Sequence, residues 1–481
     1  MNRFKILSEQ EVQRIHSAAL EVLNTTGVKV PNERARQLLA EAGATVNRET
    51  TVARIPTKVV EECLKMAPKR IIYGGRNPEH DLVLEHGGKM YVRPAAGMEG
   101  WIGLETRKYR GMTMSDLRNW IRLTDALANM DFCAAIYPTV DVSIKTRDIH
   151  IMRLFLENTE KHFLLTHPYN LRSTEYIIEM ALADRGSEEE MRKRPRISTT
   201  IDTVSPLDFS EFGIDIMFLA GKYGIPCEMN SMPVAGGTSP VTISGTLVVG
   251  HAEALALIVM AELANPGAPM VHRPVPLVLD MSTGMGSTGA IEVAMLNAAF
   301  TQLAQEATGL PCNVFGPATD SLIADGQSMT ERVFALLLPA LAGANIVSGA
   351  GNVERIYTAD PVQLVIDNDI YGMLIRLLQG IKVDDDSLGL DAIAQVGPGG
   401  HYFTSRHTLK YFKTEYHRSR LFPCKARAIW ELEGAKDLNE NAKERAMTIL
   451  KEHEPVPLGD TVKKEIDLIV QRGEKDKELS D

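Results

Sequence analysis

Polar and aromatic side chains stand where short apolar segments of this chain end, and these side chains could hold a small molecule. They are Tyr91, Arg93, Tyr137, His167, Asp202, Asn230, His272, Arg273, Asn313, Phe315 and Ser348. For each residue taken alone, anchoring of a loop or capping of a helix is an equally good explanation. These segment ends carry no lysine, and the chain has no Gly-x-Ser-x-Gly elbow and no legible Cys/His pair. The sequence therefore singles out no catalytic residue.

Residues 284–289 spell Gly-x-Gly-x-x-Gly, the pattern of a dinucleotide-binding turn. That turn belongs after the first strand of a βα unit, with an acidic residue about 20 positions later. Here the pattern follows the sixth predicted strand, and Glu306 falls inside a predicted helix. A flexible loop is the favoured interpretation.

A phosphate site is a second alternative. Gly349, Gly351 and Asn352 follow the last predicted strand, where barrel enzymes often bind phosphate through backbone N–H groups. No lysine converges on these loops, which counts against a lyase or aldolase acting on a phosphorylated substrate.

The histidines do not form a recognisable metal site. His401 and His407 lie six positions apart, which does not place them on one face of a helix. The five cysteines are far apart and form no Cys-x-x-Cys pair. We predict no intrinsic metal and no disulfide framework.

Glu253 interrupts a long apolar helix, together with His251. The favoured interpretation is a polar helix face or a buried partner for backbone groups. The alternative is that Glu253 lends negative charge beneath a binding site at the end of the preceding strand.

The elements that would position these residues alternate regularly between strand and helix. Predicted strands cover 90–95, 131–138, 162–167, 196–203, 225–232, 268–275, 310–316 and 344–349. Predicted helices cover 114–128, 149–158, 173–183, 209–223, 241–263, 289–308, 328–341 and 361–379. Eight such βα units predict an α/β fold, a (β/α)8 TIM barrel, with an open doubly wound sheet as the alternative. In a barrel the strand ends listed above meet at one face.

We expect three regions. They are an N-terminal α+β extension over 1–88, the barrel catalytic domain over 89–380, and a C-terminal cap of helices and loops over 381–481. Within the extension, the turn at His86–Gly88 predicts a hairpin that joins 81–85 to 89–92.

The amino-acid composition limits the kinds of molecule that the protein is expected to bind. The formal net charge of −10 argues against nucleic-acid binding and suits a cationic substrate. We read no signal peptide and no uninterrupted apolar run long enough for a membrane span, so a cytoplasmic protein is expected. Its size and barrel architecture favour a homo-oligomer.

Two stretches carry a resemblance to a known family. They are PVAGGTSPVTISGTLVVGHAEALALIVMAELANPGAPM, residues 233–270, and VGPGGHYFTSRHTLKYFKTEYHRSRLF, residues 396–422. With STGMGSTGAIEVAMLNAAF and LPALAGANIVSGAGNVE, they resemble the trimethylamine methyltransferase superfamily over roughly residues 5–470. Members of that family are (β/α)8 barrels that move a methyl group from a methylamine to the cobalt of a corrinoid (cobalamin) carried by a separate protein. The resemblance implies a cognate corrinoid protein as partner.

One departure from the family pattern narrows the substrate. The founding enzymes carry pyrrolysine in the segment that resembles residues 318–325, whereas this chain has ordinary residues there, with Leu322 near the expected place. The chain therefore resembles the branch without pyrrolysine, which includes glycine betaine:corrinoid protein methyltransferase. Glycine betaine is the first substrate expected, and proline betaine, carnitine and γ-butyrobetaine follow. Trimethylamine, or a betaine-binding protein without turnover, remains an alternative.

A quaternary ammonium needs aromatic faces and nearby carboxylates. The aromatic candidates are Tyr91, Trp101, Tyr137, Phe315, Tyr402 and Phe403. The carboxylate of a betaine needs paired donors, for which Arg93, His272, Arg273 and Arg355 are candidates. The loop at Gly236, Gly237 and Thr238 would let a flat corrin approach closely.

Overall fold

Eight parallel strands close into a barrel in this structure, a computed structural model that describes residues 4–166 and 168–479. The strands are β6 (Tyr91–Pro94), β9 (Cys133–Ala134), β10 (Phe163–Leu165), β11 (Ile197–Val204), β13 (Cys227–Ser231), β15 (Met270–Pro274), β18 (Asn313–Phe315) and β19 (Ile346–Ala350). Parallel pairs run from β9 to β15 and from β18 through β19 to β6. The bridge from His272 to Cys312 and the 2.9 Å bond from Asp131 N–H to Val92 O close the two remaining seams. The predicted barrel is confirmed, and the open sheet is wrong.

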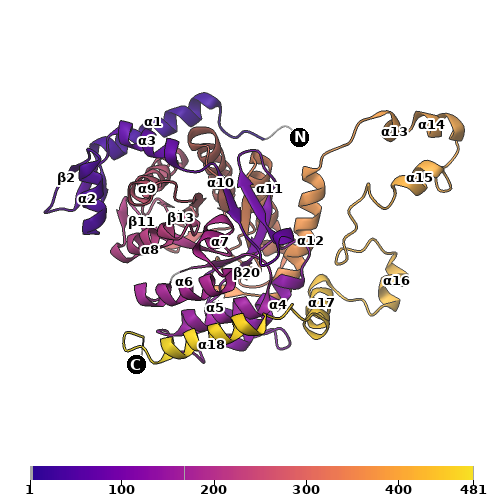
Figure 1. Ribbon diagram of the computed structural model, residues 1–481. Coiled ribbons are helices and arrows are strands. Elements are labelled where there is room, and N and C mark those ends of the chain that lie inside the picture. The colour runs from indigo at the N-terminus through magenta and orange to yellow at the C-terminus, as the bar shows by residue number, and fades with distance from the viewer. Residues whose placement is uncertain (1–3, 167, 480–481) are drawn as a thin grey trace.

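Eight helices follow these strands (Figure 1). They are α4 (Met114–Ala126), α5 (Arg147–Asn158), α6 (Leu171–Arg185), α8 (Glu211–Lys222), α9 (Ile243–Ala264), α10 (Ile291–Gln302), α11 (Gly326–Ala342) and α12 (Pro361–Leu378). Capping side chains define where several of these helices begin. Thr113 and Asp116 form a capping box on α4, and Asp325 caps α11. The side chain of Thr242 caps α9, so this helix begins two residues later than the sequence predicted.

Helix α9 is the one helix among the described residues that is long and apolar enough to cross a membrane. Most of that apolar window, 78%, is buried inside the fold. Its all-round apolar surface packs between the barrel wall and the helices α1 (Glu9–Thr25) and α3 (Thr57–Met66).

The N-terminal region closes one end of the barrel. Its strands β4 (Arg70–Tyr73) and β5 (Leu82–Glu85) pair antiparallel with each other. Their apolar side chains pack with the barrel interior in one cluster, made of Ile71, Tyr73, Leu82, Leu84, Tyr91, Phe132, Ala134, Leu164, Val271 and Ile346. The predicted hairpin between 81–85 and 89–92 is therefore wrong, because β5 pairs with β4 and the residues after the turn begin the first barrel strand.

The remaining N-terminal elements lie outside the barrel. Strands β1 (Val28–Lys29), β2 (Thr45–Val46) and β3 (Val52–Arg54) form an antiparallel edge beside α2 (Glu33–Glu41). Ser8 and Glu11 form a capping box at the start of α1.

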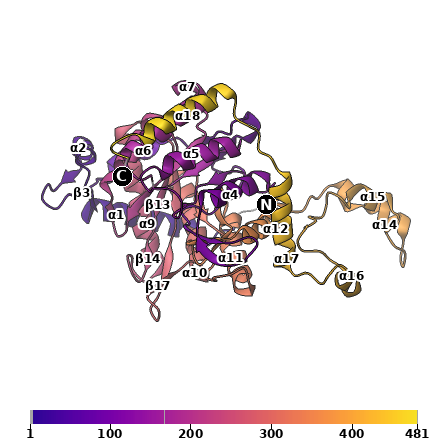
Figure 2. The same ribbon diagram turned by 90° about the horizontal axis from the view of Figure 1, so that it is seen from below.

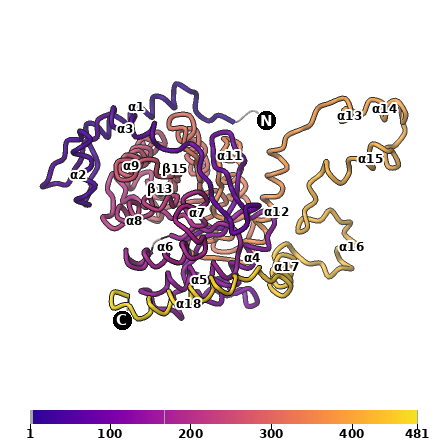
Figure 3. Tube along the Cα trace, in the orientation of Figure 1, coloured from indigo at the N-terminus to yellow at the C-terminus, as the bar shows by residue number. Residues whose placement is uncertain are grey.

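Residues 381–436, which we call the arm, project away from the barrel (Figures 1 and 3). The arm holds the short helices α13 (Asp385–Leu388), α14 (Leu390–Val396), α15 (Arg406–Tyr411) and α16 (Arg427–Leu432), and none of them buries a residue. The chain then returns: α17 (Leu438–Glu452) packs on α12 and α4, and α18 (Asp460–Glu474) packs on α6 and α5. Of the region 381–481 that was expected to form a cap, the arm thus lies away from the barrel in the single chain, whereas α17 and α18 pack against the barrel helices.

Candidate active site

A glutamate occupies the centre of the barrel interior. Glu228, on β13, is fully buried. The amide of Asn313 donates to its Oε2 at 2.8 Å, and the hydroxyl of Tyr73 donates to its Oε1 at 3.1 Å. The guanidinium groups of Arg93 and Arg273 each lie 3.4 Å from Oε2. A carboxylate is tolerated so far from water only because cations and donors surround it.

This cluster carries an excess of positive charge, since two guanidinium groups face one carboxylate. Burial lowers the pKa of Arg93 to about 10, and Glu228 opposes that effect. Arg93 also donates to Pro94 O at 2.9 Å. Arg273 donates no hydrogen bond to the part of the chain that the structure describes, and its Nε is buried without a hydrogen-bond partner. Arg273 is therefore the cation best placed to take an anion from outside.

Other buried polar atoms around this cluster also lack partners among the described residues. They are Nε of Arg93, Oγ1 of Thr200, Oδ1 of Asn230 and Oδ1 of Asn313. Buried polar groups are normally satisfied, so several orphaned atoms on neighbouring strands indicate a place for a polar ligand.

Closer to the carboxyl ends of the strands lies a second polar layer. Asn230 pairs in register with Asp202 on one side and Arg273 on the other, so all three side chains point into the barrel. The Asn230 amide donates to the Asp202 carboxylate. Tyr137 shares a 2.8 Å hydrogen bond with Thr166 Oγ1. This layer therefore brings a carboxylate and an aromatic ring to the same level as Arg273.

Tyr137 is already part of a charged group. The Arg147 guanidinium lies 4.6 Å from the centre of its ring, so one face of the ring holds a cation of the protein itself. Burial raises the pKa of the Tyr137 hydroxyl, and the nearby Asp148 raises it further, so the hydroxyl stays protonated.

Several predicted site residues meet in this interior. Arg93, Asn230 and Tyr137 lie in the two layers just described, and Ser348 is the register partner of Arg93 on β19. The Ser348 hydroxyl donates to Val314 O at 3.1 Å. Tyr91 lies deeper, beside the closed end, where its hydroxyl accepts from Val83 N–H at 3.1 Å.

Others lie elsewhere. The His272 ring faces the helix layer, 5.9 Å from the ring of His251 and 6.1 Å from that of Phe300, which places it outside the barrel. Phe315, by contrast, is the register partner of Ser348 and so shares the inward face with Arg93, where it is buried with its ring against Gly349. Tyr402 is 43% exposed on the arm, far from the barrel interior. His167 lies outside the described residues.

Glu253 is a buried anchor. Its Oε2 accepts hydrogen bonds from the hydroxyls of Thr203 and Ser205 at 2.9 Å and of Ser231 at 2.7 Å, and its Oε1 accepts from Leu207 N–H at 2.9 Å. The carboxylate thereby ties α9 to the ends of β11 and β13. This arrangement agrees with the favoured interpretation of a buried partner.

Sequence reasoning missed Glu228, the residue at the centre. It considered the ends of the strands, whereas Glu228 lies within one, two residues before Asn230. A signal was present: an acidic residue inside the apolar segment 225–232 must find a cation or donors once it is buried.

The glycine pattern at 284–289 forms part of a hairpin, not a phosphate-binding turn. Strands β16 (Leu277–Asp280) and β17 (Met285–Ser287) pair antiparallel. The N–H groups of Thr288 and Gly289 donate to the Asp320 carboxylate at 2.9 and 3.3 Å. An acidic side chain thus already occupies the position where a pyrophosphate would be needed.

The predicted phosphate loop is also occupied. The N–H of Gly351 donates to Asp367 Oδ2 at 2.7 Å, and the side chain of Asn352 donates to Pro317 O at 2.9 Å. These groups are committed within the fold, which disfavours a phosphate site there.

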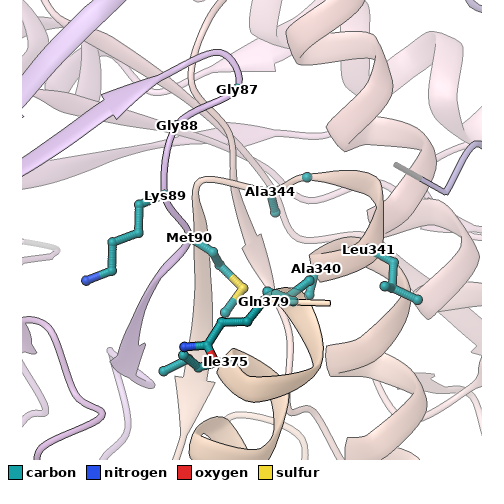
Figure 4. A pocket seen from close by; sticks show the side chains of 11 residues that line it. Gly87, Gly88, Lys89, Met90, Ala340, Leu341, Ala344, Ile375 and Gln379 are labelled. Carbon is teal, nitrogen blue, oxygen red and sulfur yellow. The ribbon is translucent and has the colours of Figure 1, made fainter. Parts of the chain in front are cut away.

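A pocket of about 430 Å³ lies at the opposite end of the barrel. Figure 4 shows Met90, just before β6, beside Gln379 and Ile375 from the end of α12, whereas the side chain of Lys89 points away from them. It lies at the amino-terminal ends of the strands and is separate from the polar interior. Among the described residues, no group of three or more His, Cys, Asp or Glu side chains could hold a metal ion.

Comparisons with known proteins agree with this architecture. The family described as Trimethylamine methyltransferase (MTTB) matches residues 1–477. Trimethylamine methyltransferase MttB of Desulfitobacterium hafniense (strain DSM 10664 / DCB-2) is 34% identical over 469 residues, which cover 97% of this chain and 93% of that protein. Glycine betaine methyltransferase of Desulfitobacterium hafniense (strain Y51) is 28% identical over 476 residues, which cover 98% of each.

A solved structure shows the same fold. The monomethylamine methyltransferase MtmB of Methanosarcina barkeri superposes with a TM-score of 0.53 at 12% sequence identity. The superposition covers 92% of this chain and 94% of that one.

Proposed function

Since this chain belongs to the trimethylamine methyltransferase (MTTB) family, we propose that it transfers a methyl group from a quaternary amine to a corrinoid carried by a separate protein. Glycine betaine is the first substrate, and proline betaine, carnitine and γ-butyrobetaine are the next. The observation that carries the proposal is the buried Arg273, which lacks a hydrogen bond to the described residues and has Asp202 on the second strand along.

The charges of the site match a zwitterion. The excess positive charge around Glu228 suits a carboxylate, which Arg273 would bind with Arg93 nearby. Asp202 and the ring of Tyr137, nearer the strand ends, suit a trimethylammonium group. A betaine bound in this way has its carboxylate deep in the barrel and its methyl groups toward the mouth.

The protein's task is then mainly one of positioning. A quaternary ammonium carries no proton and is already a competent leaving group, so no acid and no covalent link to the enzyme is needed. The chain binds the cation, orients one methyl group and excludes water. The corrinoid, when bound, supplies the cobalt nucleophile that accepts the methyl group.

The loop after β13 fits the approach of a flat macrocycle. Gly236 has a φ of 85°, and the N–H groups of Gly237 and Thr238 both donate to Val234 O at 2.9 Å, which folds the loop tightly. Gly237, at its tip, is exposed. A tip without a side chain leaves room for a corrin beside the barrel mouth.

The test is methyl transfer from each candidate amine. The protein is incubated with a reduced corrinoid protein and each betaine in turn, with trimethylamine in parallel. The demethylated amine is followed by NMR and the corrinoid by its absorbance. Absence of transfer from every quaternary amine would overturn the proposal.

A substitution at Arg273 tests the binding mode. Arg273→Gln removes a charge-assisted contact, so KM for glycine betaine should rise about tenfold or more. Tetramethylammonium lacks a carboxylate, so its inhibition constant should stay the same. Arg273→Lys, which keeps the charge, should restore part of the affinity. An equal loss for both ligands would assign Arg273 a structural role instead.

Trimethylamine is the second candidate, because the trimethylamine enzyme of Desulfitobacterium hafniense is 34% identical to this chain. Trimethylamine has no carboxylate, so it leaves the buried arginines without a ligand. In the parallel assay, faster transfer from trimethylamine than from any betaine would favour this candidate.

A further inference from the structure

The arm exposes apolar side chains that nothing in the chain covers. They are Ile381, Leu390, Phe403, Leu409, Tyr416 and Leu432, with exposed fractions from 62% for Leu409 to 86% for Ile381. Clustered apolar exposure of this kind marks an interaction surface in a folded protein.

Hydrogen bonds and ion pairs nevertheless hold the arm in a defined position. Within it, the Asp386 carboxylate accepts from both Lys410 and Tyr411. At its root, Arg376 of α12 pairs with Glu415 at 3.2 Å, and Asp369 accepts from Leu421 N–H at 3.2 Å. These contacts hold the arm in a projecting position and leave its apolar side chains outside.

The arm carries nine lysines and arginines against seven acidic residues, in a chain whose net charge is −10, and its basic residues gather in one part. Residues 396–427 include seven lysines and arginines, and Glu415 is the only acidic residue among them. Within the described residues, four of these cations have no ion-pair partner, namely Arg406, Lys413, Arg418 and Arg420. An acidic apolar surface would complement the arm.

The same chain presents such a surface at the barrel mouth. No lysine or arginine occurs between Arg273 and Arg332. In this interval, the loops that follow β15 and β18 and the starts of α10 and α11 carry the acidic residues Asp280, Glu292, Asp320, Asp325 and Glu331. Figure 2 shows β17 in a projection that extends from the barrel. We call residues 280–292 and 320–331 the acidic rim.

The acidic rim is one continuous surface with its own exposed apolar side chains. The hydrogen bonds from Thr288 and Gly289 to Asp320 join its two loops. Met281 is 78% exposed, Leu322 61% and Ile323 59%. The rim therefore offers negative charge together with an exposed apolar surface of its own.

We propose that the arm of one copy docks on the acidic rim of a second copy, so that the protein assembles with itself in solution. Docking buries the two apolar surfaces against each other and brings the unpaired cations to the carboxylates. The rim lies at the carboxyl ends of the barrel strands, so the arm carries Tyr402 to the neighbour's barrel mouth. The site residue predicted for one chain thus serves the adjacent chain.

Three leucines with nearly equal exposure provide a matched test. Leu409 lies on the arm (62% exposed), Leu322 on the acidic rim (61%) and Leu468 on α18, away from both (61%). The mass of the full chain in solution is measured by sedimentation velocity at micromolar concentration. The parent protein and Leu468→Asp should be dimers or larger, and Leu409→Asp and Leu322→Lys should be monomers with unchanged circular dichroism.

Combining the two disruptive changes tests direct contact. Leu409→Asp places a negative charge on the arm and Leu322→Lys a positive charge on the rim, so the double variant should recover assembly. A monomeric parent protein would overturn the proposal, as would assembly that neither single variant weakens.

The native cysteines allow the contact to be mapped. Cys424, on the arm, is exposed, and the other four cysteines are buried. A maleimide–benzophenone photo-crosslinker is attached to Cys424 in a mixture of ¹⁴N- and ¹⁵N-labelled protein. Crosslinked peptides of mixed isotope that contain residues 280–292 or 320–331 support the proposal. Crosslinks confined to one chain, to another surface, or to an added corrinoid protein would overturn it.

Discussion

Two guanidinium groups lie close to the Glu228 carboxylate in the buried interior of this barrel. Removing charges from water is costly, and the cluster around Glu228 offsets that cost by mutual attraction and by hydrogen bonds from Asn313 and Tyr73. The compensation is incomplete, because the Nε of Arg273 lies 3.4 Å from Glu228 Oε2 and makes no hydrogen bond to the described residues. A site that is complete only with an anionic ligand gains specificity for that ligand.

Buried histidines make the stability of the protein sensitive to acid. Burial lowers the pKa of His272 to about 4, and neither of its ring nitrogens has a hydrogen-bond partner in the described part of the chain. An unfolded histidine has a pKa near 6.5, so below that pH the unfolded chain binds the proton more strongly. The stability is fully present above pH 6.5 and is lost as the pH falls toward 4.

Replacing His272 tests this expectation. Between pH 7 and pH 4.5 the parent protein should lose about 2 to 3 kcal/mol more unfolding free energy than His272→Phe. Urea denaturation of both proteins across this range measures the difference, in which the titration of the shared carboxylates cancels. Parallel pH profiles for the two proteins would contradict the assignment.

At the scale of elements, one carboxylate joins helix α9 to the ends of two strands. Glu253 receives four hydrogen bonds from β11, β13 and the turn between β11 and α8. The same strand β11 carries Asp202 of the candidate site. The anchor therefore fixes the strand ends that position the site.

The expected cost of removing this anchor is large. Glu253→Ala should lower the stability by about 3 kcal/mol, because several buried donors lose their acceptor. Glu262→Ala, on the same helix and equally buried, removes an acceptor of one hydrogen bond, from Gly267 N–H at 2.7 Å, and should cost less. Thermal unfolding of the two variants compares them, and an equal effect would contradict the anchoring role.

The eight barrel strands could be predicted because each buried apolar segment ends in polar residues and is followed by a helical pattern. The hairpin at 81–92 could not, because the local turn signal at His86–Gly88 competes with the long-range pairing of β4 with β5. Among the candidate site residues, Arg93, Asn230 and Tyr137 follow from the strand-end rule. The same rule also selected His272, but its side chain points out of the barrel. His272 precedes the inward-facing Arg273, and neighbouring side chains on a strand point to opposite faces.

At the scale of the whole molecule, charge is distributed unevenly along the chain. A basic part of the arm and an acidic rim occur in the same sequence, whose overall charge of −10 reveals neither. The sequence could indicate helices in the C-terminal region. It could not indicate where the arm lies, because the contacts that fasten its root, from Arg376 to Glu415 and from Leu421 to Asp369, join residues far apart in the sequence.

The hairpin of β4 and β5 leaves the barrel open at one end only, because its side chains fill the other end. Under the proposed function, the amine and its demethylated product share the one open end of the barrel, and the corrinoid carrier docks over that end. The amine must therefore bind before the corrinoid carrier, and the demethylated amine must leave after the carrier has left. Binding and release thus follow a compulsory order. Product-inhibition kinetics would reveal this order as competition between the methylated and demethylated amines for the free enzyme, and random-order kinetics would contradict it.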